Sequence, residues 1–323
     1  MNEIADPARA VEADLAAAED KLIRLLDSKE PIISEICHYL VDGAGKRLRP
    51  VFVLLVHRAC GGNDRTAIDA ADAAIALELI HSATLLHDDI IDAGTLRRGK
   101  PSAFARFGAG PTLVAGDFLF CRAFELCGRF DEHLVRTAAQ ACIQLTEGEV
   151  MEGRLRHDSG ASFNDYLTVI TRKTASLFAA GGRVAADLAG APKATVDAME
   201  GLGNSVGLAF QMIDDLLDIL GPEEKIGKPV GSDLRSGIPS LPMVLGIERN
   251  PELARLFRNG TALEDGAFDR MLAALREPAL IDRARDIARE QAAKARAILT
   301  TIGPSIYRNS LASLIDAQVS RES

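Results

Sequence analysis

The chain has 323 residues, of which 47% are hydrophobic and 26% charged, so it can bury a sizeable core. Its formal net charge of −9 at pH 7 excludes a general nucleic-acid-binding role, which needs a surplus of lysine and arginine. The acidic start MNEIADPARAVEADL has no apolar signal core, and no uncharged apolar stretch approaches about 18 residues, so we expect a cytoplasmic protein without a transmembrane segment.

Helical patterns recur along the chain, and strand patterns are almost absent. The lack of Trp and the low aromatic content of 5% also favour helix over sheet. We expect one all-α domain over residues 1–323, because no Ser/Gly-rich linker divides the sequence. The expected helices cover about residues 8–27, 32–41, 45–60, 64–92, 111–129, 132–155, 163–189, 193–220, 240–257, 266–275, 279–301 and 305–320.

Five cysteines occur without any CxxC pair: Cys37, Cys60, Cys121, Cys127 and Cys142. An odd number at irregular spacing indicates buried, reduced thiols rather than disulfides or metal ligands. A reducing compartment therefore fits the chain best.

The expected helix at 45–60 begins within the basic sequence GAGKRLRP, residues 43–50. Basic side chains and free backbone N–H groups at a helix start both favour an anion. The sequence is not a P-loop, because Leu40 replaces its first glycine and Arg47 replaces its Ser or Thr.

The expected helix at 64–92 is apolar nearly all round, as is typical of a helix in the centre of a bundle. Near its C-terminal end His81, Thr84, Asp88 and Asp92 follow steps of three and four residues. These four side chains therefore share one face of the helix.

The expected helix at 193–220 repeats this arrangement with a stripe that starts at Gln211. The pattern D-D-h-h-D, where h is aliphatic, thus occurs twice, at 88–92 and 214–218. Its six carboxylates are Asp88, Asp89, Asp92, Asp214, Asp215 and Asp218. One copy alone could be a solvated helix face, but buried carboxylates must be neutralised, paired or bound to metal. Two copies favour a shared hard cation, and Mg²⁺ fits because it combines one or two carboxylates with waters and substrate phosphates.

Basic residues gather in four short sequences around the two acidic motifs: Lys46, Arg47 and Arg49 in GAGKRLRP, Arg97, Arg98 and Lys100 in LRRGKPS, Lys173 in RKT, and Lys228 in GKPVG. Any one of them alone would be a solvated surface charge. Their clustering around two magnesium-type motifs predicts a diphosphate ligand. The sequence GLGNSVG, residues 201–207, is no dinucleotide loop, because no strand precedes it and its third glycine comes one residue late. We expect its small residues to allow close helix packing.

Together these motifs resemble the trans-isoprenyl diphosphate synthases, also called polyprenyl synthetases, and most closely the long-chain octaprenyl and decaprenyl types. The likeness runs from GAGKRLRP to PSIYRNSLASLIDAQVSR, with LLHDDIID, GDFL, EGE, KTA, QMIDDLLD and GKPVGSDL in the expected order. The resemblance implies an isoprenoid-synthase helical bundle with a central apolar cavity, and a homodimer. It also implies Mg²⁺-dependent head-to-tail condensation of isopentenyl diphosphate onto an allylic diphosphate.

By the same resemblance, the six aspartates bind about three Mg²⁺ ions when substrate is present, with Asp88, Asp92 and Asp214 as the principal ligands. The residues that match the isopentenyl diphosphate site are Lys46, Arg49, His81 and Arg98. Those that match the allylic diphosphate site are Arg97, Lys173, Thr174, Gln211 and Lys228.

Two positions depart from the family pattern. The sequence DLRSGIPSLP has Ile238 where the family often has a lysine, and EGEVME has Glu152 where the family has glutamine. Neither change removes an aspartate, and both bear on how tightly the allylic substrate is held.

The resemblance also implies that product length depends on the residues four and five positions before the first motif, where an aromatic side chain would block the product tunnel. Ala83 and Thr84 are small, with Ile80 one turn further down, which predicts an open tunnel and a product of about C40 to C50, a quinone side-chain precursor. Phe120 or Phe124 on the facing helix would set a shallower floor, although either one alone is more simply explained as core packing.

Three other hypotheses stay open. A short-chain synthase would make farnesyl or geranylgeranyl diphosphate. A terpene cyclase or head-to-head synthase would lack the isopentenyl site, against which GAGKRLRP and His81 argue. A non-catalytic regulatory subunit would lose at least one acidic motif, yet both are complete. For a long-chain synthase, release of so apolar a product would involve a transient membrane contact.

Overall fold

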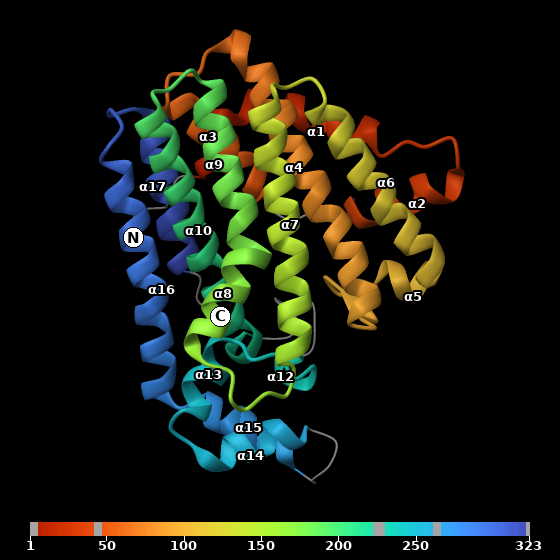
Figure 1. Ribbon diagram of the computed structural model, residues 1–323, viewed down its shortest axis with the longest axis vertical. Helices are drawn as coiled ribbons and strands as arrows, with labels where there is room; N and C mark the ends of the chain where they lie inside the picture. Colours follow the sequence, from red (N-terminus) through yellow and green to blue (C-terminus); the bar gives the residue numbers. More distant parts are fainter. Residues whose placement is uncertain (1–5, 42–46, 222–229, 261–265, 321–323) are drawn as a thin grey trace.

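A computed structural model describes residues 6–41, 47–221, 230–260 and 266–320 (Figure 1). Helices make up most of the part described, and the only strands in it are two of two residues each, which confirms the all-α fold class. Within that part, no helix is both long and apolar enough to cross a membrane.

The helical elements run in the order η1 (Pro7–Val11), α1 (Glu12–Leu25), α2 (Pro31–Val41), α3 (Leu48–Ala59), α4 (Asp64–Ile91), α5 (Ala103–Phe107), α6 (Ala109–Cys127), α7 (Glu132–Leu155), α8 (Phe163–Ile170), η2 (Thr171–Ala175), α9 (Ser176–Leu188), α10 (Lys193–Leu220), α12 (Ser232–Arg235), α13 (Leu241–Ile247), α14 (Pro251–Asn259), α15 (Ala267–Leu275), α16 (Pro278–Leu299) and α17 (Ile306–Val319). A small antiparallel hairpin, β1 (Leu96–Arg97) with β2 (Lys100–Pro101), follows α4.

The two long helices that carry the acidic motifs lie inside the bundle. Helix α4 packs against α3, α6 and α9, and α10 packs against α9 and α16. Both are buried over much of their length, as their nearly all-round apolar sequences predicted. Asn63 and Thr66 form a capping box at the start of α4. Figure 1 shows α2, α5 and α6 on one side of this bundle, and α14 and α15 at one end of the molecule.

Glycines set the spacing between α9 and α10. A Cβ atom on Gly203 would lie 2.1 Å from the carbonyl oxygen of Phe178, and one on Gly207 would lie 2.6 Å from Cα of Ala175. No larger side chain fits at either position without moving a backbone. The expectation that GLGNSVG serves close helix packing is confirmed.

Two local predictions were wrong, and two short elements were missed. The single helix expected at 240–257 is two helices, because Asn250 accepts hydrogen bonds from the N–H groups of Glu252 and Leu253 and caps a new helix that starts at Pro251. The helix expected at 163–189 is interrupted by the π-helical turn η2. The hairpin and α5 were not predicted at all.

All five cysteines are free in the structure. Cys37 and Cys127 are buried, and burial raises the pKa of Cys37 to about 12. Cys121 is exposed, so the expectation of burial was wrong for this residue, which lies on the outer face of α6.

Candidate active site

The first aspartate of each acidic motif lies in the wall of one cavity of about 300 Å³, called here the main cavity. Helix α4 supplies Asp88 and α10 supplies Asp214, although the two residues are 126 positions apart in the sequence. The other residues of its wall are Arg49, His81, Thr84, Leu85, Arg97, Arg98, Leu145, Glu149, Lys173, Thr174, Phe210 and Gln211. Carboxylates and cations thus face one another across a single space.

The cations of the main cavity come from three separate elements. Arg49 belongs to α3, Arg97 and Arg98 to the hairpin, and Lys173 to the turn η2. Burial lowers the pKa of Arg49, while the charges of nearby carboxylates raise it. Burial and three neighbouring arginines lower the pKa of His81 well below its usual range, so its imidazole is neutral at pH 7. His81 can therefore offer a hydrogen bond but not a charge.

The hairpin aims the two arginines. Its central residues Arg98 and Gly99 have φ angles of 52° and 74°, the pattern of the type I′ turns that join short antiparallel strands. The guanidinium of Arg97 contacts Oδ1 of Asp89 at 2.7 Å through Nη2, and its Nε donates to the same oxygen at 2.8 Å. Asp89, which is 2% exposed, is therefore placed to orient Arg97.

The cations of the protein near Asp88 do not offset the cost of burying its negative charge. Burial raises its pKa to about 7; Lys173 and Arg97 oppose this rise, and the carboxylates of Glu149 and Asp92 add to it. A hard cation in the main cavity would offset the repulsion between these carboxylates. The oxygen donors of Asp88 and Asp214 suit Mg²⁺. Among the described residues, no group of three His, Cys, Asp or Glu side chains is placed to hold a metal ion.

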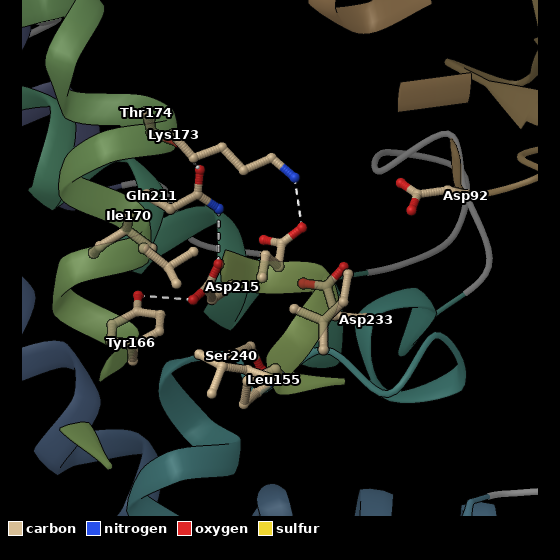
Figure 2. A pocket seen from close by; sticks show the side chains of 14 residues that line it. Asp92, Leu155, Tyr166, Ile170, Lys173, Thr174, Gln211, Asp215, Asp233 and Ser240 are labelled. Atoms are coloured by element: carbon tan, nitrogen blue, oxygen red, sulfur yellow. Dashed lines mark hydrogen bonds and ion pairs between the residues drawn. The ribbon is translucent and has the colours of Figure 1, made fainter. Parts of the chain in front are cut away.

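A second, smaller cavity of about 170 Å³ lies beside the first (Figure 2). Lys173, Thr174 and Gln211 line both cavities and thus form the wall between them. The other residues around the second cavity are Asp92, Glu152, Leu155, Tyr166, Val169, Ile170, Asp215, Asp233, Ile238, Pro239 and Ser240. Glu152 and Ile238, the two positions that depart from the family pattern, therefore face the same space.

Hydrogen bonds tie Asp215 into the protein, as Figure 2 shows for two of its partners. Its carboxylate accepts from Tyr166 Oη at 2.8 Å, Gln211 Nε2 at 2.8 Å and the N–H of Leu241 at 3.0 Å. Burial and then the charge of Asp233 raise the pKa of Asp215 to about 7, against the lowering effect of these donors. Asp215 thus joins α8, α10 and the start of α13.

The last aspartates of the two motifs have different surroundings. Asp218 is buried and accepts from Ser232 Oγ at 2.7 Å and from the N–H of Asp233 at 3.1 Å, which fixes the start of α12. Asp92 is exposed at the end of α4, where it forms an ion pair with Arg156 from the end of α7.

The π-helical turn places Lys173 and Thr174 between the cavities. A Cβ atom on Gly148 would lie 2.7 Å from the backbone nitrogen of Lys173, so only glycine lets α7 lie this close to the turn. Thr174 donates to Gln211 Oε1 at 2.8 Å, and Gln211 in turn donates to Asp215. Single π-turns of this kind are frequent at functional sites.

The main cavity brings together ten of the predicted site residues: Asp88, Asp214, Arg49, His81, Arg98, Arg97, Lys173, Thr174, Gln211 and Thr84. Asp92 and Asp215 line the second cavity, whereas Asp89 and Asp218 line neither. Lys46 and Lys228 lie outside the described residues. Of the other basic residues in the cluster, Arg47 pairs with Glu78 at 3.2 Å and Lys100 is exposed on β2.

Of the residues predicted to line a product tunnel, some lie at a cavity and others lie in the core or at the surface. Thr84 faces the main cavity together with Leu145, while Ala83 and Ile80 are fully buried in the core and line neither cavity. On α6, Phe120 is half-buried with its ring 5.9 Å from that of His87. Phe124 is 46% exposed, which places it at the surface of the chain.

Several residues of the two cavities were not predicted from the sequence. Glu149 belongs to the EGE sequence, and Phe210 directly precedes the polar stripe of α10, so both could have been found by their neighbours. Tyr166 carries no comparable signal, because its partner Asp215 is 49 positions away in the chain.

Known proteins share both the sequence and the fold. The polyprenyl synthetase family matches residues 30–274. The octaprenyl diphosphate synthase of Haemophilus influenzae is 35% identical, over 99% of this chain and 96% of its own. The nonaprenyl diphosphate synthase of Mycobacterium tuberculosis is 36% identical, over 97% and 94%. A polyprenyl synthase from Caulobacter crescentus, complexed with calcium and isoprenyl diphosphate, superposes with a TM-score of 0.93 at 35% identity, over 99% and 98% of the two chains.

Proposed function

The chain belongs to the polyprenyl synthetase family, and on this premise we propose that it is a trans-polyprenyl diphosphate synthase that uses Mg²⁺. The proposed reaction joins isopentenyl diphosphate head-to-tail to an allylic diphosphate. The observation that carries the proposal is the main cavity, where Asp88 and Asp214 face Arg49, Arg97 and Lys173. Such an arrangement suits two diphosphates and the metal ions that accompany them.

The residues of the main cavity have distinct proposed tasks. Lys173 and Arg97 bind the allylic diphosphate, with Asp88 and Asp214 holding Mg²⁺ beside it, while Arg49, Arg98 and neutral His81 hold isopentenyl diphosphate. Bound Mg²⁺ supplies Lewis-acid stabilisation of the charge that develops on a leaving diphosphate.

Loss of diphosphate from an allylic carbon leaves a carbocation, which water would destroy. The apolar side chains of Leu85, Leu145 and Phe210 in the cavity wall help to exclude water from it. The final proton can pass to an oxygen of the released diphosphate. The reaction therefore requires no Ser/His/Asp or Cys/His arrangement from the protein.

The proposed product is long, about C40 to C50, and would serve as a quinone side-chain precursor. The printed names of the octaprenyl and nonaprenyl relatives support this length, as does the small residue Thr84 in the cavity wall. A short-chain product is the second candidate, because the main cavity measures only about 300 Å³ and the residues behind Thr84 are packed core.

Purified protein incubated with Mg²⁺, isopentenyl diphosphate and labelled farnesyl diphosphate tests both candidates. We expect Mg²⁺-dependent elongation and a product of about C40 to C50 on sizing. A product that stops at geranylgeranyl length would support the second candidate. Absence of elongation, or elongation without Mg²⁺, would contradict the proposed activity.

A homodimer in the cytoplasm is the proposed form of the enzyme, with transient membrane contact when product is released. Exposed apolar side chains on α6 and α7 offer a surface for the second copy: Leu113, Val114, Phe124, Ile143 and Val150. Light scattering should give twice the chain mass of 34.5 kDa, and a monomer would contradict this part of the proposal.

A further inference from the structure

Lys173 forms ion pairs with two carboxylates of the protein. Its Nζ lies 2.5 Å from Glu152 Oε2 and 2.6 Å from Glu149 Oε2. In Figure 2 the side chain of Lys173 extends across the second cavity toward its ion-pair partner. The three side chains are only 22%, 12% and 15% exposed for Lys173, Glu152 and Glu149, so solvent screens these contacts less than it would at the surface.

The local backbone fixes this arrangement. Glu149 and Glu152 are three residues apart on α7 and therefore share a face. Gly148 allows that face to lie directly against the turn that carries Lys173. The two glutamates differ in one respect: Glu149 lines the main cavity, whereas Glu152 lines the second cavity.

Lys173 remains a cation although it is largely buried. Burial lowers its pKa, but the carboxylates of Glu152, Asp88 and Glu149 outweigh that effect and raise it above the ordinary value. Loss of the Glu152 carboxylate would leave the three N–H donors of this ammonium less fully used by the protein.

Lys173 is also one of the cations that face the main cavity, where the proposed function places the allylic diphosphate. A diphosphate oxygen that approaches this ammonium meets a group that already donates to Glu152 and is ion-paired with Glu149. Like charges at such short range repel, so each carboxylate in contact with Lys173 opposes the binding of a polyanion.

We propose that Glu152 is an affinity-determining residue of the allylic site, an internal carboxylate that competes with the substrate diphosphate for Lys173. When substrate binds, Lys173 exchanges its contact with Glu152 for one with a diphosphate oxygen. The same exchange in reverse assists departure of the diphosphate from Lys173. This inference rests on the proposed function, and it adds a residue that faces the second cavity rather than the reaction space.

Direct binding of farnesyl diphosphate tests the inference without turnover. Isothermal titration at fixed Mg²⁺, with isopentenyl diphosphate left out, would compare the wild type with Glu152→Gln, Glu152→Asp and the surface control Glu132→Gln. We expect Glu152→Gln to tighten Kd by roughly three- to tenfold, since it removes one opposing charge. Glu152→Asp keeps the charge and should stay closer to the wild type. Glu132→Gln, on the same helix but exposed, should change nothing.

The effect of Glu152→Gln on steady-state kinetics should be confined to one of the two substrates. Glu152→Gln should lower KM for the allylic diphosphate by a similar factor and leave KM for isopentenyl diphosphate unchanged. An unchanged or weakened Kd for Glu152→Gln, or equal effects of Gln and Asp, would overturn the inference. A wild type that neither binds farnesyl diphosphate nor elongates it would instead overturn the proposed function.

Discussion

The two acidic motifs share one pattern, but the protein around them uses the pattern differently. In the first motif, residues 88–92, the middle carboxylate orients an arginine of the hairpin and the last one is exposed. In the second motif, residues 214–218, both of these carboxylates are buried and accept hydrogen bonds from the segment 232–241. Only the first aspartate of each motif faces the main cavity.

The aspartates of the two motifs therefore divide into residues that face the ligand space and residues that support the surrounding fold. Asp88 and Asp214 line the main cavity, while Asp215 and Asp218 hold α12 and the start of α13 in place. Substitutions in the cavity-facing positions should therefore reduce turnover, and substitutions in the buried positions of the second motif should reduce stability. The following changes test that division, from the largest expected effect to the smallest.

Asp88→Asn and Asp214→Asn should each lower the rate of elongation by roughly 10² to 10⁴, because each removes a charge proposed to hold Mg²⁺ beside the leaving diphosphate. The free energy of unfolding should change little. Initial rates at saturating substrate, with circular dichroism as the control for folding, measure both effects. Near-normal turnover in either variant would refute its metal-binding role.

Asp215→Ala should lower the free energy of unfolding by about 3 kcal/mol, because it leaves Tyr166 and the N–H of Leu241 without their buried acceptor. Asp92→Ala should lower it by less than about 1 kcal/mol, since its ion pair with Arg156 is partly exposed. Urea unfolding of the two variants measures the contrast. Equal losses would show that the motifs are not used differently.

Thr84→Phe should shorten the product with the fold intact, because Thr84 lines the main cavity. Ala83→Phe should instead cost about 1 to 3 kcal/mol of stability, because Ala83 is fully buried in the packed core. Product sizing and urea unfolding, applied to both variants, separate the two outcomes. A shortened product from Ala83→Phe alone would mean that the tunnel runs behind the cavity wall.

Tyr166→Phe should cost about 1 to 2 kcal/mol in the free energy of unfolding, a smaller loss than that expected for Asp215→Ala. The substitution removes one of three donors to Asp215 and leaves its other partners. Turnover should fall by no more than a fewfold. A larger loss of turnover without a loss of stability would give Tyr166 a direct part in the reaction.

The sequence could predict the features that depend on neighbouring residues, and it could not predict those that depend on residues distant in the chain. The buried helices α4 and α10 and their polar stripes were predicted, because a helical period is a local property of the chain. The hairpin was missed because two-residue strands carry no periodic signal. Asn250 and Pro251 are a sequence signal for a helix boundary, but the apolar residues on both sides led to the prediction of one continuous helix.

The candidate site shows the same limit. Repetition of the acidic motif predicted that α4 and α10 would meet, and their first aspartates do line one cavity. The division of tasks within each motif could not be predicted, since it depends on partners such as Leu241 and Arg156, 26 and 64 positions away. The contact of Glu152 with Lys173 is likewise a tertiary property, made possible by Gly148.

The Mg²⁺ dependence of elongation tests the central claim most directly, that one aspartate from each motif holds the metal in the main cavity. Elongation by the wild type should require Mg²⁺, and the concentration for half-maximal rate should rise by about tenfold or more in Asp88→Asn and in Asp214→Asn. Asp215→Asn, measured on folded protein, should shift it by only a fewfold. A wild-type Mg²⁺ dependence in Asp88→Asn and Asp214→Asn would contradict the account.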